Sequence, residues 1–445
     1  MAGKRNIVNK TKGSARLITV AALAAGWLMA AAAAFSQDDV RSQEEMIVSA
    51  RQYLEDRLYV RTISGYREAL AAYQTENNPR YEDELLAIYK EAGMQEEYYG
   101  MLENRAEARA AGAEEYLELA EFYLDRGSVF KAIPILKQGI ESCHDDELTA
   151  LYESVIYEYS AAGTTFTQTL MPAADWYIPA YDGEHWGYIG ADGRTLLDFI
   201  YEEATCFSGS YAVVKLDGVY TLIDKKGYRN AVDKNGIDRV TSFVGGRLTG
   251  VKDGRYAIYN NVFRKISEES YDDIRLSENG TAAVCRDGRW ALLDTHLEEV
   301  TDYRFTDVAA DSRGLVFYGN YGVVADETGY FLVDQTGEPY FEKRFANAKG
   351  IESGLFAVAD ASGKWGFANA KGELVVECQY EDACSFSDHL AAVLDGDKWG
   401  YINRYNTKVI EAQFTQAQSF LAGKAMVKDA MGNVKILTLK YYDYF

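Results

Sequence analysis

Apolar positions recur with two different periods along the chain. From about Asp38 to Gly163 the period is helical and β-branched runs are few. Helix breakers divide this region into pieces of about 12 to 20 residues, the length of ordinary globular helices. The breakers are Asn77-Asn78-Pro79, Gly93, Gly112, Gly127 and His144-Asp145. We therefore predict antiparallel helix pairs joined by short turns.

Residues 113–141 show one such pair most clearly. The first predicted helix has Leu119, Ala120 and Tyr123 on one face and ends at Gly127. The second predicted helix has an apolar face that contains Ala132, Leu136 and Ile140. The stretch resembles a tetratricopeptide repeat, whose small residues let paired helices approach closely. That resemblance implies a concave groove for peptide segments. The alternative is a spacer that holds the next domain away from a membrane.

From about residue 172 the pattern is organised around aromatic residues. Trp186-Gly187, Trp365-Gly366 and Trp399-Gly400 begin three copies of one element. Weaker copies begin at Tyr220, Tyr256, Trp290 and Tyr330, and a truncated copy begins at Val434. Successive copies are 34, 36, 34, 40, 35, 34 and 35 residues apart. A fixed period of this length indicates a repeat architecture, and the long fourth unit places an insertion around Asp311–Gly322.

Each copy contains similar turn signals. Asp217-Gly218, Asp253-Gly254 and Asp287-Gly288 stand just before an aromatic residue, and Asp-Gly between apolar runs favours a type I′ hairpin turn. A second aromatic lies fifteen residues after the first, at Tyr201, Tyr271, Phe305, Phe345, Tyr380 or Phe414. The second unit has Asn235 at this position instead. Each unit thus reads as several short strands, which bury their apolar faces only against neighbouring units.

The Trp-Gly register resembles the WG-repeat family of bacterial proteins, over the region from about Trp176 to the C-terminus. The resemblance implies a β-rich repeat domain, often exported and often joined to helical repeats, with a structural motif and no catalytic residues. Seven units and a closing fragment favour a β-propeller, in which Val434–Leu439 completes the unit that begins near Trp176–Ile178. A solenoid of β-hairpins is the alternative.

The N-terminal residues differ from the rest of the chain. Lys4, Arg5, Lys10, Lys12 and Arg16 precede the uncharged, alanine-rich stretch 17–35. This order is typical of a secretory signal peptide, although the stretch also just reaches the length of a membrane-spanning helix. We therefore predict a signal peptide or an N-terminal membrane anchor at 1–36, helical repeats at 38–165, and about seven β-repeat units at 172–445. Either form of the leader places the remainder outside the cytoplasm.

Charge narrows the choice of partners. The formal net charge is −22 at pH 7. Such acidity argues against nucleic-acid binding, which needs Lys and Arg to replace counterions, and against adhesion to an anionic membrane surface. Any membrane contact is therefore expected only through the N-terminal segment.

Candidate chemistry is sparse. The five cysteines form no CxxC pair, and we expect buried free thiols, with a Cys378–Cys384 disulfide as the alternative. The acidic pairs Glu202-Glu203, Asp272-Asp273 and Glu381-Asp382 recur with the repeat, which favours turn or cap roles over acid–base catalysis. Asp395-Gly396-Asp397 and Asp233–Gly236 lack the ligand spacing of a calcium loop. No nucleophile elbow, phosphate loop, zinc motif or dinucleotide fingerprint is present.

The sequence therefore predicts a protein that binds other proteins and is not an enzyme, with no cofactor and no metal. Its helical and β-repeat surfaces are the expected contact regions. The alternative function is glycan binding at the cell envelope, which requires aromatic rings exposed at the tips of the repeats.

Overall fold

A computed structural model describes residues 43–72, 79–164, 166, 168–170 and 176–444. The chain divides into two compact units, Met1–Tyr152 and Glu153–Phe445. The predicted leader at 1–36 lies outside the described residues. Within the described ranges, no helix is both long and apolar enough to cross a membrane.

The first unit is helical, as predicted. Its described helices are 43–55, α2 (Tyr59–Ala72), α3 (Pro79–Glu91), α4 (Gln95–Glu107), α5 (Ala113–Asp125), α6 (Val129–Cys143) and α7 (Asp146–Ile156), the last of which runs into the second unit. Breaks fall where the sequence places them: Gly93, Gly127 and His144 have φ of 70°, 68° and 54°, in the left-handed region. Helix ends commonly adopt this conformation.

The pair α5 and α6 forms the predicted hairpin around small residues. Ala120 and Ala132 are fully buried, and Tyr123 is nearly so. Successive helices are also joined by a recurring contact, in which a tyrosine hydroxyl and a cation share one glutamate. The three sets are Tyr66, Glu84 and Arg51; Tyr98, Glu118 and Lys90; and Tyr123, Glu103 and Lys131.

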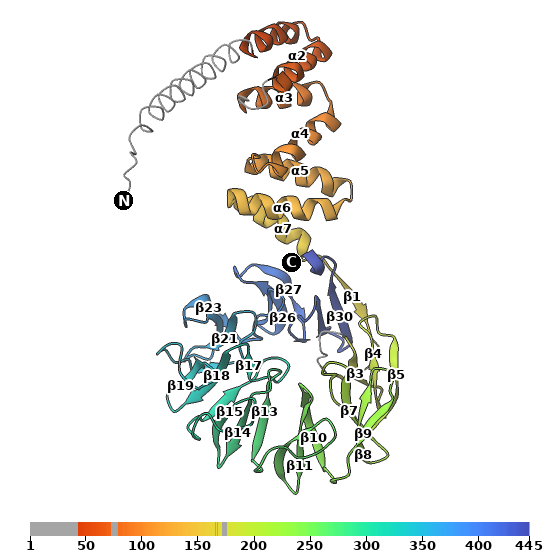
Figure 1. Cartoon of the computed structure of the whole chain (residues 1–445), viewed down its shortest axis with the longest axis vertical. Coiled ribbons are helices and arrows are strands. Elements are labelled where there is room, and N and C mark those ends of the chain that lie inside the picture. Colours follow the sequence, from red (N-terminus) through yellow and green to blue (C-terminus); the bar gives the residue numbers. More distant parts are fainter. Residues whose placement is uncertain (1–42, 73–78, 165, 167, 171–175, 445) are drawn as a thin grey trace, which may run out of the picture. The chain divides into compact units, whose positions relative to one another are not determined.

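The second unit is a β-propeller of eight sheets, which we number as blades 1 to 8 (Figure 1). Blade 1 contains β2 (Gln168–Thr169), β3 (Ile178–Tyr181), β4 (Trp186–Ile189) and β5 (Thr195–Tyr201). Blade 2 contains β6 (Glu203–Ala204), β7 (Tyr211–Leu216), β8 (Val219–Asp224) and β9 (Arg229–Val232). Blade 3 contains β10 (Arg239–Val244), β11 (Arg247–Lys252) and β12 (Arg255–Asn260). Blade 4 contains β13 (Asp273–Leu276), β14 (Ala282–Arg286) and β15 (Arg289–Leu293).

The remaining blades continue this antiparallel order. Blade 5 contains β16 (Asp307–Ala309), β17 (Phe317–Tyr318), β18 (Tyr321–Asp326) and β19 (Gly329–Val333). Blade 6 contains β20 (Asn347–Ala348), β21 (Leu355–Ala359), β22 (Trp365–Asn369) and β23 (Leu374–Tyr380). Blade 7 contains β24 (Asp382–Ala383), β25 (Leu390–Asp395), β26 (Lys398–Asn403) and β27 (Lys408–Phe414). Blade 8 contains β28 (Gln416–Ala417), β29 (Lys424–Lys428), β30 (Val434–Leu439) and the early strand β1 (Tyr159–Gly163).

Closure of the ring corrects three predictions, which concern the partner of β30, the start of the propeller and the number of blades. β30 pairs with β1, through five residue pairs from Tyr159↔Leu439 to Gly163↔Lys435, and not with the Ile178 strand, which lies in blade 1. The boundary predicted at 165–172 was therefore too late, because residues 159–163 already belong to the propeller. With β1 in place, the closing fragment is a complete blade, and the ring has eight blades where about seven units were predicted. The solenoid alternative is wrong, because the last sheet is completed by the first strand.

The Asp-Gly turns adopt the conformation that their sequence predicts. Asp217, Asp253 and Asp287 have φ of 53°, 52° and 52°, and the glycines that follow have φ of 74°, 74° and 75°. Two successive positive φ angles define the type I′ turn, whose twist matches that of the flanking strands.

The aromatic register is a set of cross-strand pairs. In six units the first aromatic lies directly opposite the aromatic fifteen residues later. The pairs are Trp186–Tyr201, Tyr256–Tyr271, Trp290–Phe305, Tyr330–Phe345, Trp365–Tyr380 and Trp399–Phe414. The second residue of each pair is buried. These rings therefore fill the space within and between blades.

The glycine of the Trp-Gly dipeptide has a separate role. In blades 1, 6 and 7 the fourth strand bulges over this glycine, because Trp399 pairs with Phe414 whereas Tyr401 pairs with Ile410. A Cβ on Gly400 would lie 2.6 Å from the Ile410 carbonyl oxygen, too close for any side chain. Gly366 and Gly187 are similarly crowded.

Blades whose unit lacks this glycine also lack the full fourth strand. Ala257, Ala291 and Phe331 occupy the position in blades 3, 4 and 5, and only isolated bridges remain where the other blades have seven-residue strands. In blade 2, where Thr221 occupies it, the fourth strand β9 has four residues. The glycine thus allows the outer strand to form over its full length.

We predict that Gly400→Ala destabilises the propeller by about 1–3 kcal/mol, the usual cost of overpacking. The matched control is Gly163→Ala, in a strand position where nothing lies within 4 Å of the added carbon. Urea unfolding of both variants measures the effect. Equal free energies of unfolding would contradict the crowding that we describe.

Candidate functional site

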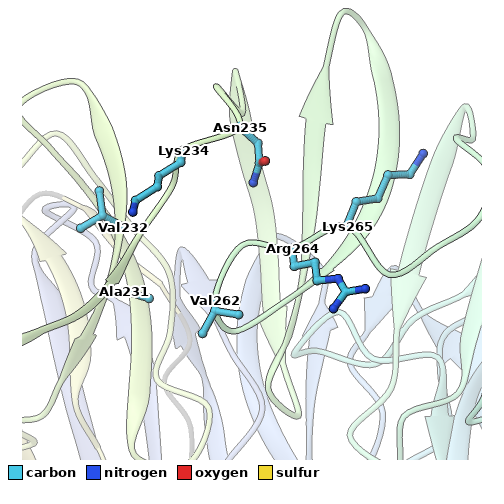
Figure 2. A pocket seen from close by; sticks show the side chains of 7 residues that line it. All are labelled: Ala231, Val232, Lys234, Asn235, Val262, Arg264 and Lys265. Atoms are coloured by element: carbon cyan, nitrogen blue, oxygen red, sulfur yellow. The ribbon is translucent and has the colours of Figure 1, made fainter.

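Two of the repeat units in the propeller depart from the common pattern, and each departure creates a surface feature. The first departure is in unit 2, where Asn235 replaces the aromatic. The chain leaves β9 at Val232, and the Asn235 amide donates a hydrogen bond to the Phe263 carbonyl in the next unit. A groove of about 590 Å³ lies here, and Figure 2 shows its lining side chains: Ala231, Val232, Lys234, Asn235, Val262, Arg264 and Lys265.

The second departure concerns the loops between the first and second strands of the blades, which we call the AB loops. They are 205–210, 245–246, 277–281, 310–320, 349–354, 384–389 and 418–423 in blades 2 to 8. The first strands, such as β10 and β13, face the centre of the ring (Figure 1). Hydrogen bonds join the AB loops of adjacent blades. The Gly245 N–H of blade 3 donates to Ser208 Oγ of blade 2 at 2.9 Å, and the Gly350 N–H of blade 6 donates to the Ala310 carbonyl of blade 5 at 2.9 Å. The Gly423 N–H of blade 8 donates to Asp388 Oδ2 of blade 7 at 2.8 Å.

The 40-residue unit contains the longest of these loops. Asp311 folds it into a tight turn, because its Oδ1 accepts the backbone N–H groups of both Arg313 and Leu315 at 2.9 Å. The added β17 then attaches the loop to blade 4, where Phe317 N–H donates to Ser277 Oγ at 3.2 Å. The insertion thus places Arg313 among the AB loops of neighbouring blades.

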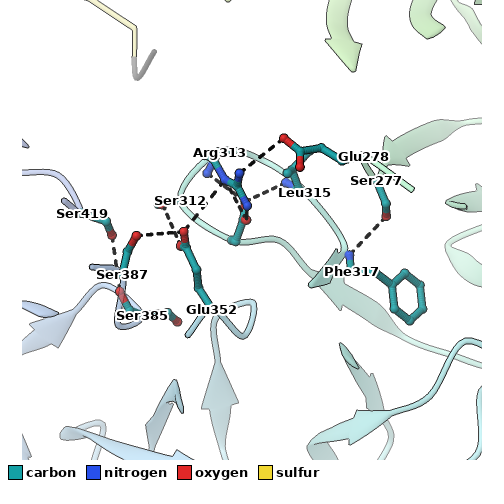
Figure 3. A network of polar contacts seen from close by, with 11 residues as sticks. Ser277, Glu278, Ser312, Arg313, Leu315, Phe317, Glu352, Ser385, Ser387 and Ser419 are labelled. Atoms are coloured by element: carbon teal, nitrogen blue, oxygen red, sulfur yellow. Dashed lines mark hydrogen bonds and ion pairs between the residues drawn. The ribbon is translucent and has the colours of Figure 1, made fainter. Parts of the chain in front are cut away.

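Arg313 is the centre of a charged cluster (Figure 3). Its guanidinium lies 3.0 Å from Asp311 Oδ2, 3.4 Å from Glu278 Oε1 and 4.0 Å from Glu352 Oε1. The Asp311 and Glu352 side chains are 3% and 5% exposed, whereas that of Glu278 is 67% exposed. Three carboxyl groups therefore surround one cation, with two of them inside the protein and one at the surface.

Glu352 connects three blades. Ser387 of blade 7 donates to its Oε1 at 2.9 Å, and Ser312 of blade 5 donates to its Oε2 at 3.4 Å. Burial raises the pKa of Glu352 to about 7, and the negative charge of Asp311 adds to the increase, while Arg313 and the Ser387 hydrogen bond oppose it. The carboxyl group therefore changes its charge near neutral pH.

A cavity of about 400 Å³ lies beside this cluster. Blades 1 to 3 supply a largely apolar and hydroxyl wall, while Glu278, Arg313 and Leu315 come from blades 4 and 5. The AB loops of blades 2, 4 and 5, strand β10 of blade 3 and Leu170 of blade 1 line it, so the cavity exists only where several blades meet.

The predicted repeat residues lie elsewhere and have structural positions. Tyr220 and Trp290 are buried, Trp365 is 9% exposed, and Trp186, Tyr256, Tyr330 and Trp399 are half-buried. Their rings are therefore not exposed at the tips of the repeats.

The recurring acidic pairs are part of the blade structure. Glu202, Asp272 and Glu381 each accept a backbone N–H of a neighbouring Asp-Gly turn, as from Gly218 at 2.8 Å and Gly396 at 2.9 Å. The second member of two pairs binds a side chain: Glu203 accepts the Tyr220 hydroxyl at 2.6 Å, and Asp382 accepts the Lys349 ammonium at 2.7 Å. These are turn and cap roles.

The cysteines are all free thiols, so the Cys378–Cys384 disulfide does not form in this structure. Cys285 is buried and the others are half-buried. Burial raises the pKa of Cys206 to about 12. Across the described ranges, no three His, Cys, Asp or Glu side chains gather closely enough to hold a metal ion.

Three of the repeat units match a known protein family. The family model described as "WG containing repeat" matches residues 186–220, 365–399 and 399–429. Three repeat units of this propeller match the WG-repeat family. The matches begin at the three Trp-Gly dipeptides, and thus at the three blades with a full outer strand.

Several solved structures are similar to part of this chain. One entitled "Crystal structure of the eukaryotic initiation factor" has 10% identity, covers 62% of this chain and 85% of its own, and gives a TM-score of 0.41. "YCF48 bound to D1 peptide" has 10% identity, coverage of 63% and 96%, and a TM-score of 0.30. The Pan2 WD40 domain of Neurospora crassa has 8% identity, coverage of 52% and 86%, and a TM-score of 0.30. No curated protein matches the sequence.

Sequence reasoning about the propeller missed the charged cluster. Asp311, Arg313, Glu352 and Ser387 belong to no motif. The available signal was the 40-residue spacing, which placed an insertion at this loop. For the groove between blades 2 and 3, the available signal was Asn235, which stands where the other units have an aromatic residue.

We predict that Glu352→Gln changes how stability depends on pH. The pKa of Glu352 is raised in the folded state, so its contribution is present at low pH and is lost as pH rises through about 7. Relative to the Gln variant, the wild-type protein should lose on the order of 1 kcal/mol or more between pH 5.5 and 8.5. Denaturant unfolding at both pH values measures this, with exposed Glu298→Gln as the control. A pH-independent difference would be inconsistent with the buried, shifted carboxyl.

Proposed function

We propose that this chain is an exported, non-catalytic scaffold that binds a protein partner on the AB-loop face of its propeller. The supporting observation is the 40-residue unit. It adds residues to one AB loop only, and those residues bring a charged cluster beside a cavity of about 400 Å³. A loop needed only for packing does not require a half-buried arginine with three carboxyl groups around it.

The cavity suggests the kind of contact. Its walls combine apolar side chains such as Leu315 with the exposed carboxylate of Glu278. With Glu352 ionised, the cluster carries three negative charges and one positive charge. A partner segment that presents an apolar side chain next to a lysine or arginine complements both features. The strong overall acidity of the chain would speed the approach of such a segment.

The helical unit offers a second contact region. A groove of about 410 Å³ on α2 is lined by Val60, Ile63, Ser64, Arg67, Glu68, Ala71 and Met94, and Val60 is 81% exposed. Apolar grooves between helices suit peptide segments. This supports the peptide-binding alternative for the helical unit over a spacer.

Export and the absence of catalysis belong to the same proposal. Export rests on the basic and apolar leader at residues 1–36. The non-enzymatic role is supported by the acidic pairs, whose oxygens are occupied by turns and tyrosines. The buried aromatic register gives glycan stacking no specific support.

The test is a pull-down from cell-envelope extract with full-length protein and two charge-reversed variants. Glu278→Lys changes the exposed carboxylate at the cavity, and Glu298→Lys makes the same change at an exposed position of the same blade that does not line the cavity. We expect a captured protein to be retained by the wild type and by Glu298→Lys, and to fall at least several-fold with Glu278→Lys. Equal capture by all three proteins, or no specific capture, would overturn the proposal.

A further inference from the structure

The groove between blades 2 and 3 is basic, although the chain as a whole is strongly acidic. Lys234, Arg264 and Lys265 line it, and none of its seven lining residues carries a carboxyl group. A charge of this sign is unexpected on a chain with a net charge of −22. The groove is therefore a positively charged region on a protein whose net charge is negative.

Within the part of the chain that the structure describes, these cations have no acidic partners. Among the described residues, neither Lys234 nor Arg264 forms an ion pair, and the Lys265 ammonium contacts the Ser270 hydroxyl at 3.0 Å. The adjacent Asp233 is buried, and its two oxygens accept the backbone N–H groups of Asn235 at 2.8 Å and Ile237 at 2.7 Å. Its charge is thus directed into the loop and does not neutralise the groove.

The groove also has an apolar component. Val232 and Val262 are 41% and 59% exposed, and they lie on opposite sides, with Lys234 near the first and Arg264 near the second (Figure 2). The Asn235 amide holds the two sides together through the Phe263 carbonyl, and the Lys252 ammonium donates to the Asn235 carbonyl. The lining is therefore held in place before any ligand arrives.

We propose that this groove binds an extended acidic peptide segment of a partner protein, with carboxylates at Lys234 and Arg264 and apolar side chains on Val232 and Val262. Charge complementarity decides the sign of the ligand. The apolar component favours a peptide over a compact anion, because a phosphate ion offers no apolar surface to cover Val232 and Val262. This site is separate from the cavity at the AB loops and does not depend on the function proposed for that cavity.

The absence of the repeat aromatic supports this interpretation. In six other units an aromatic occupies the position of Asn235 and pairs across the blade. In unit 2 the backbone N–H of Asp233 instead donates to the Tyr220 carbonyl, and the loop after Val232 forms one side of the groove.

The experiment measures binding of a fluorescein-labelled peptide of alternating glutamate and leucine to the full-length protein by fluorescence anisotropy. The test variant is Lys234→Glu/Arg264→Glu. The matched control is Lys371→Glu/Arg404→Glu, which alters exposed cations in the turns after β22 and β26 and changes the net charge equally. We expect about tenfold weaker binding for the test variant, from two reversed charge contacts, and little change for the control.

Competition distinguishes the ligand classes. Unlabelled peptide should displace the probe, whereas inorganic phosphate and polyglucuronate at the same charge concentration should displace it much less. Equal weakening of both double variants would show a general charge effect and overturn the proposal. Displacement by phosphate or polyglucuronate as effective as that by peptide would assign the groove to simple anions or glycans and would also overturn it. A circular dichroism spectrum of each variant confirms that it is folded.

Discussion

The propeller depends on one pairing of strands that are far apart in sequence. β1 and β30 are separated by about 270 residues, and their five paired positions convert an open array of sheets into a ring. Without this pairing, blades 1 and 8 would each expose a sheet face that is apolar in the closed form. The central AB-loop face would also lose its fixed geometry, because its contacts run from blade to blade. The cavity beside Arg313 therefore depends on closure.

The recurring positions of the repeat stabilise the propeller, whereas the two exceptional repeat units form its distinctive surface features. The aromatic pairs and the glycine under the outer strand recur because every blade faces the same packing problem. The 40-residue unit and the unit with Asn235 break the pattern, and each creates a feature that packing does not require. One is a buried cluster of mixed charge, and the other is a basic groove. Their opposite electrostatic character suggests that the ring engages two different segments of partner proteins.

The sequence predicted the regular part well for a physical reason. A cross-strand pair such as Trp399–Phe414 needs aromatic residues at a fixed spacing, and a type I′ turn needs residues such as Asp217-Gly218. Both leave signals within one unit. The pairing of β1 does not, because Tyr159–Gly163 contains no turn signal or aromatic register, and its partner lies at the other end of the chain. The cluster around Arg313 could not be predicted from a single unit either, because Asp311, Glu352 and Ser387 come from three different blades.

The most direct test of closure compares two proline substitutions in β1. Thr164 N–H donates to Val434 and Lys440 N–H donates to Glu158, so the antiparallel alternation directs the Ala162 N–H towards β30 and the Ala161 N–H away from it. Both residues are exposed. Ala162→Pro should lower the free energy of unfolding by about 1–2 kcal/mol more than Ala161→Pro, because only the former removes a ladder hydrogen bond. Equal, small effects of the two prolines in denaturant unfolding would contradict a ring closed by β1.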